Sequence, residues 1–354
     1  MSDQKQQRFW INNPLFDGVF ILSPPFVSLL VVWLLPGVFK QTAAMPVAAW
    51  VLLVLFVDVA HVYSTLFRTY FDPVRFRRQR SLYLFIPVIC YMAGVLLHGI
   101  DGMLFWRVLA YLAVFHFIRQ QYGFMRLYAR REQSRKAFRL IDTLTVYYAT
   151  IYPLLYWHLT PGRNFNWFID GDFLQGDAQQ ALSVFSWLYG LLVAVYIVKE
   201  AWQTISTGIF NLPKNLVITG TLVSWYFGIV YFNGDLAFTL LNVVSHGIPY
   251  MALIWYTARK ERLPQAVKDN PVRAAVIKRY GVLLFVCMLF ALAYLEEGLW
   301  DGFVWRDHGS VFAFFGALPQ VTDKYLLTFL VPLLSLPQST HYVLDAFIWR
   351  RKDG

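Results

Sequence analysis

The sequence has little charge and almost no cysteine. Asp, Glu, Lys and Arg make up only 15% of its 354 residues, whereas a soluble chain of this length carries about 25%. The two cysteines, Cys90 and Cys287, lie in apolar segments, with neither the spacing of a metal site nor a disulfide framework. The shortage of thiolates argues against an iron–sulfur cluster or a structural zinc, and the shortage of charge argues against a soluble protein.

Several signals of common protein classes are also missing. There is no P-loop and no glycine fingerprint of a dinucleotide-binding fold. The basic residues do not form a face interleaved with aromatic side chains, so we expect no nucleic-acid partner. No cleavable signal pattern precedes the first apolar segment.

Long apolar runs are present along the whole chain. Hydrophobic residues make up 58% of the sequence, and the mean hydropathy is +0.47. A run of about 20 apolar residues is long enough to cross a bilayer as a helix. We therefore predict an all-α, polytopic integral membrane helix bundle that forms a single domain over residues 1–354. The predicted transmembrane helices, about ten in number, span residues 19–39, 44–67, 81–100, 103–125, 140–160, 181–199, 215–233, 236–257, 276–297 and 325–348.

The basic residues predict the orientation of these spans. Most of the 31 Lys and Arg residues follow spans 2, 4 and 8 or close the chain, in clusters such as residues 75–80 and 350–352. Positive charge stays on the cytoplasmic side of a membrane, so both termini are predicted to be cytoplasmic. We expect an integral protein of a bacterial inner membrane. Its net charge of +10 is then a consequence of topology.

Four of the predicted spans carry a histidine three or four positions from a second polar residue. This spacing places both side chains of a pair on one face of a helix. Counted from the basic residues that follow each span, the four histidines lie at similar depth in the cytoplasmic half of the bilayer. Ionisable groups inside a bilayer are costly and are usually functional. The four pairs are Asp58/His61, His116/Gln120, Asn242/His246 and His341/Asp345.

The residue types of these pairs suit a metal. Imidazole with carboxylate is a donor set for iron, zinc, copper or manganese, and helix bundles build dinuclear sites from such pairs. We predict Asp58 and Asp345 as ligands or charge-neutralising carboxylates, with Gln120 and Asn242 as weaker ligands or as hydrogen bonders that fix an imidazole tautomer. Arg119 is expected to face the bundle and to pair a carboxylate or hold an anionic substrate group. The predicted histidine ligands are His61, His116, His246 and His341.

The motifs resemble a known family. The last segment reads Pro337-Gln-Ser-Thr-His341-Tyr-Val-Leu-Asp345-Ala-Phe-Ile-Trp-Arg350, and it resembles the ending of the bacterial Brp/Blh-type membrane carotene dioxygenases. The pair at 116/120 is similar to a family motif of His with a carboxylate four residues on. The pair at 242/246 is similar to the family's His-x-x-x-His with the first His replaced, and the pair at 58/61 takes the place of the family's first His motif. The resemblance implies an iron-dependent, dioxygen-using enzyme that acts on a bilayer-dissolved substrate.

Together these patterns predict a membrane metalloenzyme. We expect an iron-dependent oxygenase or oxidase that hydroxylates, desaturates or oxidatively cleaves a lipid or isoprenoid, with one or two irons (two favoured) and an electron donor that the sequence does not identify. Asp58, Asp345 and Arg119 are the expected catalytic side chains. Three alternatives stay open: a proton-coupled transporter with an Asp/His relay, a haem held by two histidines, and polar pairs that only join helices.

Overall fold

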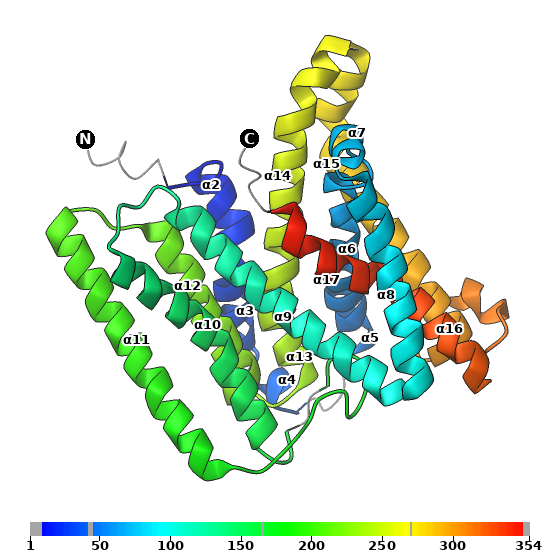
Figure 1. The fold of residues 1–354 in the computed structure, drawn as a ribbon, viewed down its shortest axis with the longest axis horizontal. Helices are drawn as coiled ribbons and strands as arrows, with labels where there is room; N and C mark the ends of the chain where they lie inside the picture. Colours follow the sequence, from blue (N-terminus) through cyan, green and yellow to red (C-terminus); the bar gives the residue numbers. More distant parts are fainter. Residues whose placement is uncertain (1–8, 42–44, 164–165, 270, 350–354) are drawn as a thin grey trace. The chain divides into compact units, whose positions relative to one another are not determined.

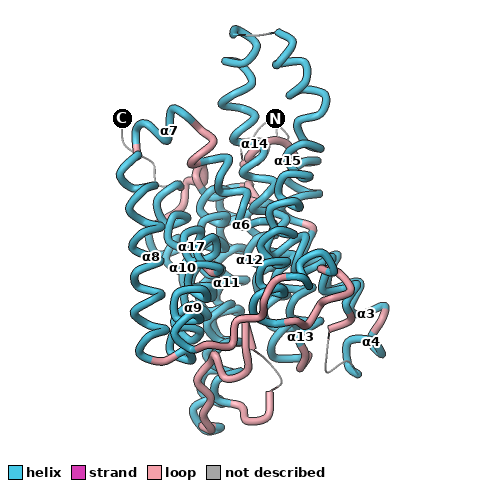
Figure 2. The backbone as a smooth tube through the Cα atoms, turned by 90° about the vertical axis from the view of Figure 1, so that its right-hand side faces the viewer, coloured by secondary structure: helices cyan, strands magenta, loops and turns pink. Residues whose placement is uncertain are grey.

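The computed structural model describes residues 9–41, 45–163, 166–269 and 271–349. Within these ranges all regular secondary structure is helical, and Figure 2 shows helices joined by loops. The predicted all-α class is confirmed. Residues 1–8 and 350–354 lie outside the described ranges, and with them the predicted cytoplasmic termini and Arg350 of the last motif.

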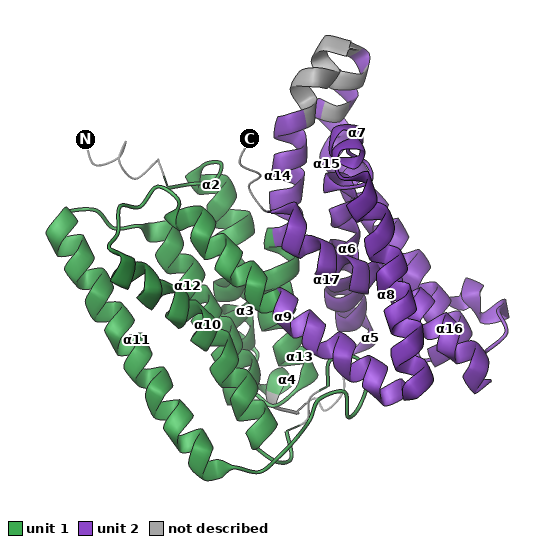
Figure 3. Ribbon diagram, in the orientation of Figure 1, with its two compact units in different colours: residues 1–45, 117–249 green, residues 46–116, 250–354 purple. Residues whose placement is uncertain are grey.

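The chain forms two compact units (Figure 3). Unit 1 comprises residues 1–45 and 117–249, and unit 2 comprises residues 46–116 and 250–354. The chain passes from one unit to the other between residues 45 and 46 and inside two long helices, α9 (Gly102–Ala129) and α14 (Val244–Asp269). The expectation of a single membrane domain stays a prediction.

Unit 1 is built mainly from long helices around α10 (Lys136–Leu159). Helix α10 packs against α11 (Gln179–Thr207) and α12 (Leu212–Trp225), and α12 packs against α3 (Pro24–Leu34) (Figure 1). Three of its short elements, η1, η4 and η5, are π-helical. The short elements of unit 1 are α2 (Pro14–Asp17), η1 (Gly18–Leu22), α4 (Pro36–Gln41), η4 (Tyr226–Tyr231), α13 (Asp235–Phe238) and η5 (Thr239–Val243).

Unit 2 contains most of the helices that carry the predicted site. Helix α15 (Pro271–Trp300) packs against α6 (Ala60–Ser64) and against the π-helix η2 (Trp50–Val59) that precedes it. Helix α17 (Leu336–Ile348) packs against α6 and against α8 (Arg80–Ile100), which also contacts α16 (Lys324–Leu334). The short elements of unit 2 are α5 (Val47–Ala49), η3 (Thr65–Arg68), α7 (Pro73–Arg78), η6 (Asp301–Trp305) and η7 (Ala313–Ala317).

Six helices in the described ranges are long and apolar enough to cross a membrane. A seventh span results if the pair Pro14–Leu22 and Pro24–Leu34, bent by 52°, is counted as one. The predicted spans 140–160, 215–233 and 325–348 are helical but do not meet this criterion, so the number of ten stays a prediction. The six helices are Val47–Arg68, Arg80–Ile100, Gly102–Ala129, Gln179–Thr207, Asp235–Glu261 and Lys278–Trp305.

The outer faces of these helices are apolar. On α8, Phe85 is 63% exposed and Leu96 is 66% exposed, and on α11 Trp187 and Ile205 reach 82% and 84%. A water-soluble protein rarely leaves long apolar faces of this kind uncovered. These surfaces support an integral membrane protein.

The last predicted span is divided into two helices. Helix α16 ends at Leu334, and α17 begins at Leu336 with Pro337 in its first turn. Proline lacks a backbone N–H, so it is accommodated in the first turn of a helix and not inside a continuous one. The 13 residues of α17 extend over about 20 Å, which is too short to cross the roughly 30 Å hydrocarbon core alone.

Apolar packing fixes the helices of unit 2 that carry site residues. Leu55, Val59 and Ala60 pack in one core with Tyr250 and with the side chains of α15, which places His61 beside that core. On α17, Leu344 is fully buried and packs with Tyr83 of α8. Because Leu344 adjoins Asp345 in the chain, this contact sets the direction of the Asp345 side chain.

Unit 1 buries a network of five charged side chains, the carboxylates Glu132, Asp142 and Glu200 and the ammonium groups Lys199 and Lys214. Lys199 donates to Asp142 and Glu200. Lys214 Nζ lies 3.0 Å from Glu132 Oε1 and 2.5 Å from Glu200 Oε1. Burial alone would lower the pKa of Lys214, but the surrounding carboxylates outweigh it and raise this pKa. The lysine ammonium groups already occupy the space among the carboxylates. The network therefore has a structural role and holds α10, α11 and α12 together.

Replacing one of these lysines should destabilise unit 1. The change Lys214→Met removes one positive charge and leaves buried carboxylates without their partner, which typically costs about 3–5 kcal/mol. We expect a clear fall in the melting temperature of the detergent-solubilised protein, followed by circular dichroism. The matched change at the exposed Lys136, Lys136→Met, should leave the melting temperature near that of the wild type. Equal melting of the two variants would contradict this account.

Candidate metal centre

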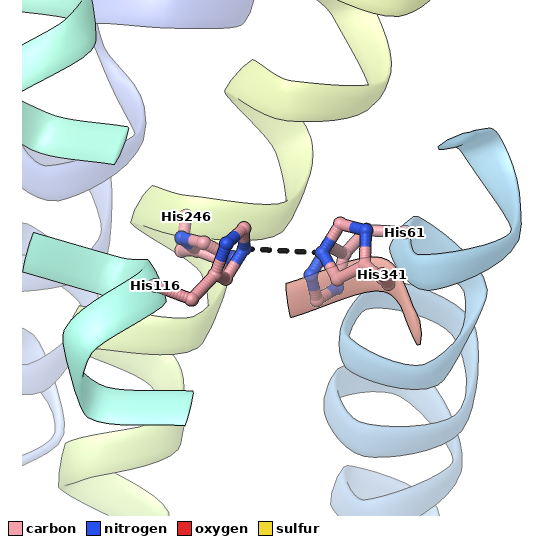
Figure 4. Close-up of side chains that lie close together, drawn as sticks. All are labelled: His61, His116, His246 and His341. Carbon is pink, nitrogen blue, oxygen red and sulfur yellow. Dashed lines mark hydrogen bonds between the residues drawn. The ribbon is translucent and has the colours of Figure 1, made fainter. Parts of the chain in front are cut away.

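The four histidines singled out by the sequence come from four different helices. His61 lies on α6, His116 on α9, His246 on α14 and His341 on α17. Each is buried, with at most 2% of its surface exposed. His61, His116 and His341 belong to unit 2, and His246 belongs to unit 1. Within unit 2, one ring nitrogen of each of the three histidines lies within 4.8 Å of those of the other two, so these three can hold a metal ion (Figure 4).

Two of these histidines follow directly on π-helical segments. The π-helix η2 ends at Val59, two residues before His61, and η5 ends at Val243, three residues before His246. Such segments are rare and are frequently found at functional sites. Each extra residue in a π turn rotates the side chains that follow it around the helix axis. The local backbone therefore sets the face on which both histidines lie.

A ring of five side chains in unit 2 surrounds two of the histidines. His341 Nδ1 lies 2.7 Å from Thr65 Oγ1, and Thr65 Oγ1 lies 3.1 Å from the Tyr250 hydroxyl. Tyr250 donates to Asp345 Oδ1 over 2.9 Å. The other oxygen, Asp345 Oδ2, lies 3.4 Å from His116 Nδ1, and His116 Nε2 lies 3.0 Å from His341 Nε2. All five residues are buried.

The direction of these hydrogen bonds assigns the imidazole tautomers. A carboxylate only accepts, so Tyr250 uses its one proton on Asp345 and must accept from Thr65. Thr65 then has no proton left, and its oxygen accepts from Nδ1–H of His341. On the other side of the ring, the Asp345 carboxylate favours the proton on Nδ1 of His116. A proton on Nδ1 of both histidines fits these contacts.

The rings of His116 and His341 approach each other closely. Their Nε2 atoms are 3.0 Å apart, and the donor of this hydrogen bond depends on the tautomers of the two rings. Figure 4 shows the two rings directed toward one another across this contact. A metal ion bound between the rings would take the place of this hydrogen bond, with one nitrogen of each imidazole directed at it.

Asp345 is held by a third donor. Trp349 Nε1 donates to Asp345 Oδ1 over 2.7 Å, in addition to the bond from Tyr250. The guanidinium of Arg68 lies 4.1 Å from the centre of the Trp349 ring. Both carboxylate oxygens are engaged in this way, so Asp345 orients His116 and balances charge. The sequence left open whether Asp345 ligates a metal directly; its contacts favour the charge-balancing role.

His61 and Asp58 form the third part of the site in unit 2. His61 Nδ1 lies 3.6 Å from Asp58 Oδ1, and the Asp58 side chain keeps 30% of its surface exposed. The ring centre of His61 is 5.0 Å from that of His341 and 6.4 Å from that of His116. The structure therefore places Asp58 behind His61, as the spacing of three predicts.

Within unit 1, His246 is fixed by its own neighbours. Its ring stacks on Phe117 with the ring centres 3.5 Å apart, and its backbone carbonyl accepts from Gln120 Nε2 over 2.9 Å. Asn242 is buried on η5, and its side-chain atoms have no hydrogen-bond partner among the described residues. A Cβ at Gly228 would lie 2.2 Å from Asn242 Nδ2, so the amide packs against that glycine. Of the two predicted amide residues, Gln120 therefore contacts His246 through the backbone carbonyl of that histidine.

Arg119 is placed differently from the sequence expectation. Its side chain is exposed; the guanidinium donates to the Tyr147 hydroxyl and lies 5.0 Å from the centre of the Tyr122 ring. His116, one turn earlier, is buried. These contacts give no support to the role predicted for Arg119, which stays a prediction.

Sequence reasoning missed three residues of the site, Thr65, Tyr250 and Trp349. Each lies four positions after a predicted site residue on its own helical stretch. Residues four positions apart on a helix lie on one face. Applying this spacing one turn beyond His61, His246 and Asp345 would have identified all three. Hydroxyl and indole groups are not metal ligands of the expected type, so the search for ligands passed over them.

Comparison with known proteins gives no match. No protein-family model, no curated protein and no solved structure matches this chain. The resemblance to the Brp/Blh-type dioxygenases stays a prediction from short motifs.

Removing the charge of Asp345 should weaken metal binding. In Asp345→Asn the outer support of His116 is lost, and such changes typically cost about 10–100-fold in metal affinity. We expect a fall of this size for Co²⁺, titrated into the purified protein and followed by visible absorption. Asp301 is also buried in unit 2 but accepts from the backbone of His308, so Asp301→Asn is a suitable control. Unchanged Co²⁺ affinity in Asp345→Asn would contradict the role of this carboxylate.

Proposed function

We propose that the protein is a membrane-embedded, iron-dependent oxygenase or oxidase that uses dioxygen to hydroxylate, desaturate or cleave a lipid or isoprenoid. The observation that carries the proposal is the close approach of three buried histidines of unit 2, with His116 Nε2 and His341 Nε2 3.0 Å apart. A metal ion between the rings would bind both nitrogens at once. His61 extends the donor set of unit 2 to three, and the assignment of His246 as a ligand stays a prediction from the sequence.

The spacing of the histidines suits a metal ion. With metal–nitrogen distances of about 2.1 Å, two nitrogens 3.0 Å apart subtend an angle of about 90–95° at the ion. That angle corresponds to neighbouring positions of an octahedral or five-coordinate centre. Opposite ligands in such a centre lie about 4.2 Å apart, so the three histidines of unit 2, whose nitrogens lie within 4.8 Å of one another, need only small movements to close on one ion.

Iron is the metal that we propose, in a single copy. Neutral imidazoles would leave positions open for dioxygen at the ion, and imidazole is a usual donor for redox-active iron. The sequence slightly favoured two irons because the added carboxylates of Asp58 and Asp345 would allow two metals. The contacts of Asp345 with Tyr250, Trp349 and His116 favour one iron, since its oxygens are already engaged.

The apolar surroundings support a substrate dissolved in the bilayer. The rings of Tyr250 and Tyr342 lie 6.3 Å and 5.2 Å from the ring of His116, measured between ring centres. Aromatic side chains exclude water and suit a flat, apolar molecule, and exclusion of water protects a reactive intermediate. Asp58 is the most exposed polar group beside the histidines of unit 2, which marks the edge at which a substrate would approach His61.

A shared proton is the alternative occupant of the contact between His116 and His341. One ring would then be an imidazolium paired with Asp345, as in a proton relay of a transporter. That arrangement uses two of the histidines and gives no reason for His61 to be buried beside them. Metal analysis separates the two interpretations.

The decisive measurement is the iron content of the protein purified in detergent without chelators. We expect about one iron per chain by inductively coupled plasma mass spectrometry, lost in His116→Ala and in His341→Ala. His98→Ala is the control, because His98 lies at the end of α8, outside the group of four. A wild-type protein free of stoichiometric transition metal would overturn the proposal and favour the proton relay.

A second measurement tests the open coordination positions. Nitric oxide binds ferrous iron in place of dioxygen and gives a characteristic electron paramagnetic resonance signal. We expect this signal in the iron-loaded wild type. An iron-loaded protein that fails to bind nitric oxide would show a coordinatively closed centre and would contradict an oxygenase.

A further inference from the structure

The hydrogen bonds of Asp345 lead to a partly exposed residue of unit 2. His116, His341, Thr65, Tyr250 and Asp345 are all less than 9% exposed. Trp349, which donates to Asp345, is half-buried at the end of α17. Among these six residues Trp349 is the one with appreciable exposed surface, and Asp58 beside His61 is the other partly exposed group next to the histidines of unit 2.

A continuous path of short contacts joins this indole to the proposed metal. Trp349 Nε1–H donates to Asp345 Oδ1 over 2.7 Å, and Asp345 Oδ2 lies 3.4 Å from His116 Nδ1. His116 then presents Nε2 to the metal position. The path therefore crosses two polar contacts and otherwise runs through the bonds of a carboxylate and an imidazole.

An oxygenase of the proposed kind needs such a path. Iron that has been oxidised to the ferric state must gain one electron before it can bind dioxygen again. Its ligands are buried, so a donor protein cannot touch them. Electron tunnelling weakens steeply with distance and passes better through bonds and hydrogen bonds than through gaps between side chains.

We propose that Trp349 is the site at which electrons enter the metal centre, and that Asp345 and His116 carry them to the iron. This inference rests on the function proposed above. The donor is a one-electron carrier of the iron–sulfur class. It is oxidised by one electron, and ferric iron is reduced to ferrous iron. No covalent bond forms or breaks, and the protons on Trp349 Nε1 and His116 Nδ1 stay in place.

The surroundings of Trp349 suit a bridge that is not itself oxidised. The guanidinium of Arg68 stands 4.1 Å from the ring centre, and its positive charge opposes the formation of an indole radical cation. The same stacking holds the ring against α17 in one orientation. Arg68 is in turn 3.8 Å from Glu261, which also pairs with Arg75.

Two variants of Trp349 test the inference in the iron-loaded full-length protein. Trp349→Phe keeps an aromatic ring under Arg68 but has no N–H for Asp345, and Trp349→Leu removes the aromatic ring as well. Trp255→Phe is the control, because Trp255 is a half-buried tryptophan of unit 2 that packs against Phe285. For each protein we would measure iron content, the ferric/ferrous potential and the rate of anaerobic reduction by a reduced ferredoxin.

We expect the limiting reduction rate at saturating ferredoxin to fall at least tenfold in Trp349→Leu and by a smaller factor in Trp349→Phe. Iron content and the nitric oxide signal should match those of the wild type, and Trp255→Phe should be reduced at the wild-type rate. The potential measurement corrects each rate for a changed driving force.

Three results would overturn the inference while leaving the proposed function intact. The first is an unchanged limiting reduction rate in iron-loaded Trp349→Leu. The second is a Trp349 variant that changes only the ferredoxin concentration needed for half-saturation and not the limiting rate. The third is loss of iron from both Trp349 variants. The last would show that Trp349 only holds Asp345 in place. Absence of iron from the wild type would instead overturn the proposed function, and the electron path with it.

Discussion

The carboxylate of Asp345 is the group on which the arrangement of unit 2 depends. A buried carboxylate is tolerated only when its oxygens accept hydrogen bonds, and here the donors come from three separate helical segments of the unit. Tyr250 and Trp349 donate to one oxygen, and His116 faces the other. Because all three groups must reach the same carboxylate, α9, α14 and α17 meet at Asp345. The same contacts decide which nitrogen of His116 is left for a ligand.

The apolar core of unit 2 determines the directions in which the polar side chains of the site point. Leu344 packs against α8, and Val59 and Ala60 pack against α15. Each of these residues adjoins a site residue or lies within two positions of it. Because a helix separates adjacent side chains by about 100°, burying one side chain determines where its neighbour points. Dispersion and apolar burial thus provide the orientation, and hydrogen bonds provide the chemistry.

Much of this could be predicted from the sequence, and the rest could not for physical reasons. The helical class and the four buried histidines follow from hydropathy and from spacing, which are local properties. The break before α17 depends on Pro337, which the sequence displays, but its effect on span length depends on packing. Arg119 was expected inside because its spacing from His116 fits, yet its exposed contact with Tyr147 depends on tertiary neighbours. The closed ring through Thr65 and Tyr250 joins residues far apart in the chain, and no local pattern reveals it.

The π-helical segments before His61 and His246 have a consequence for chain length. A segment of this kind accommodates one residue more than an α-helical turn of equal rise, and one residue corresponds to about 100° around the helix axis. The histidine layer is therefore specified by the number of residues in η2 and η5 as well as by their identity. A homologous chain with all four histidines but one residue fewer in η5 would turn its histidine out of the layer. Insertions and deletions in these segments are accordingly as informative about the site as substitutions of the histidines.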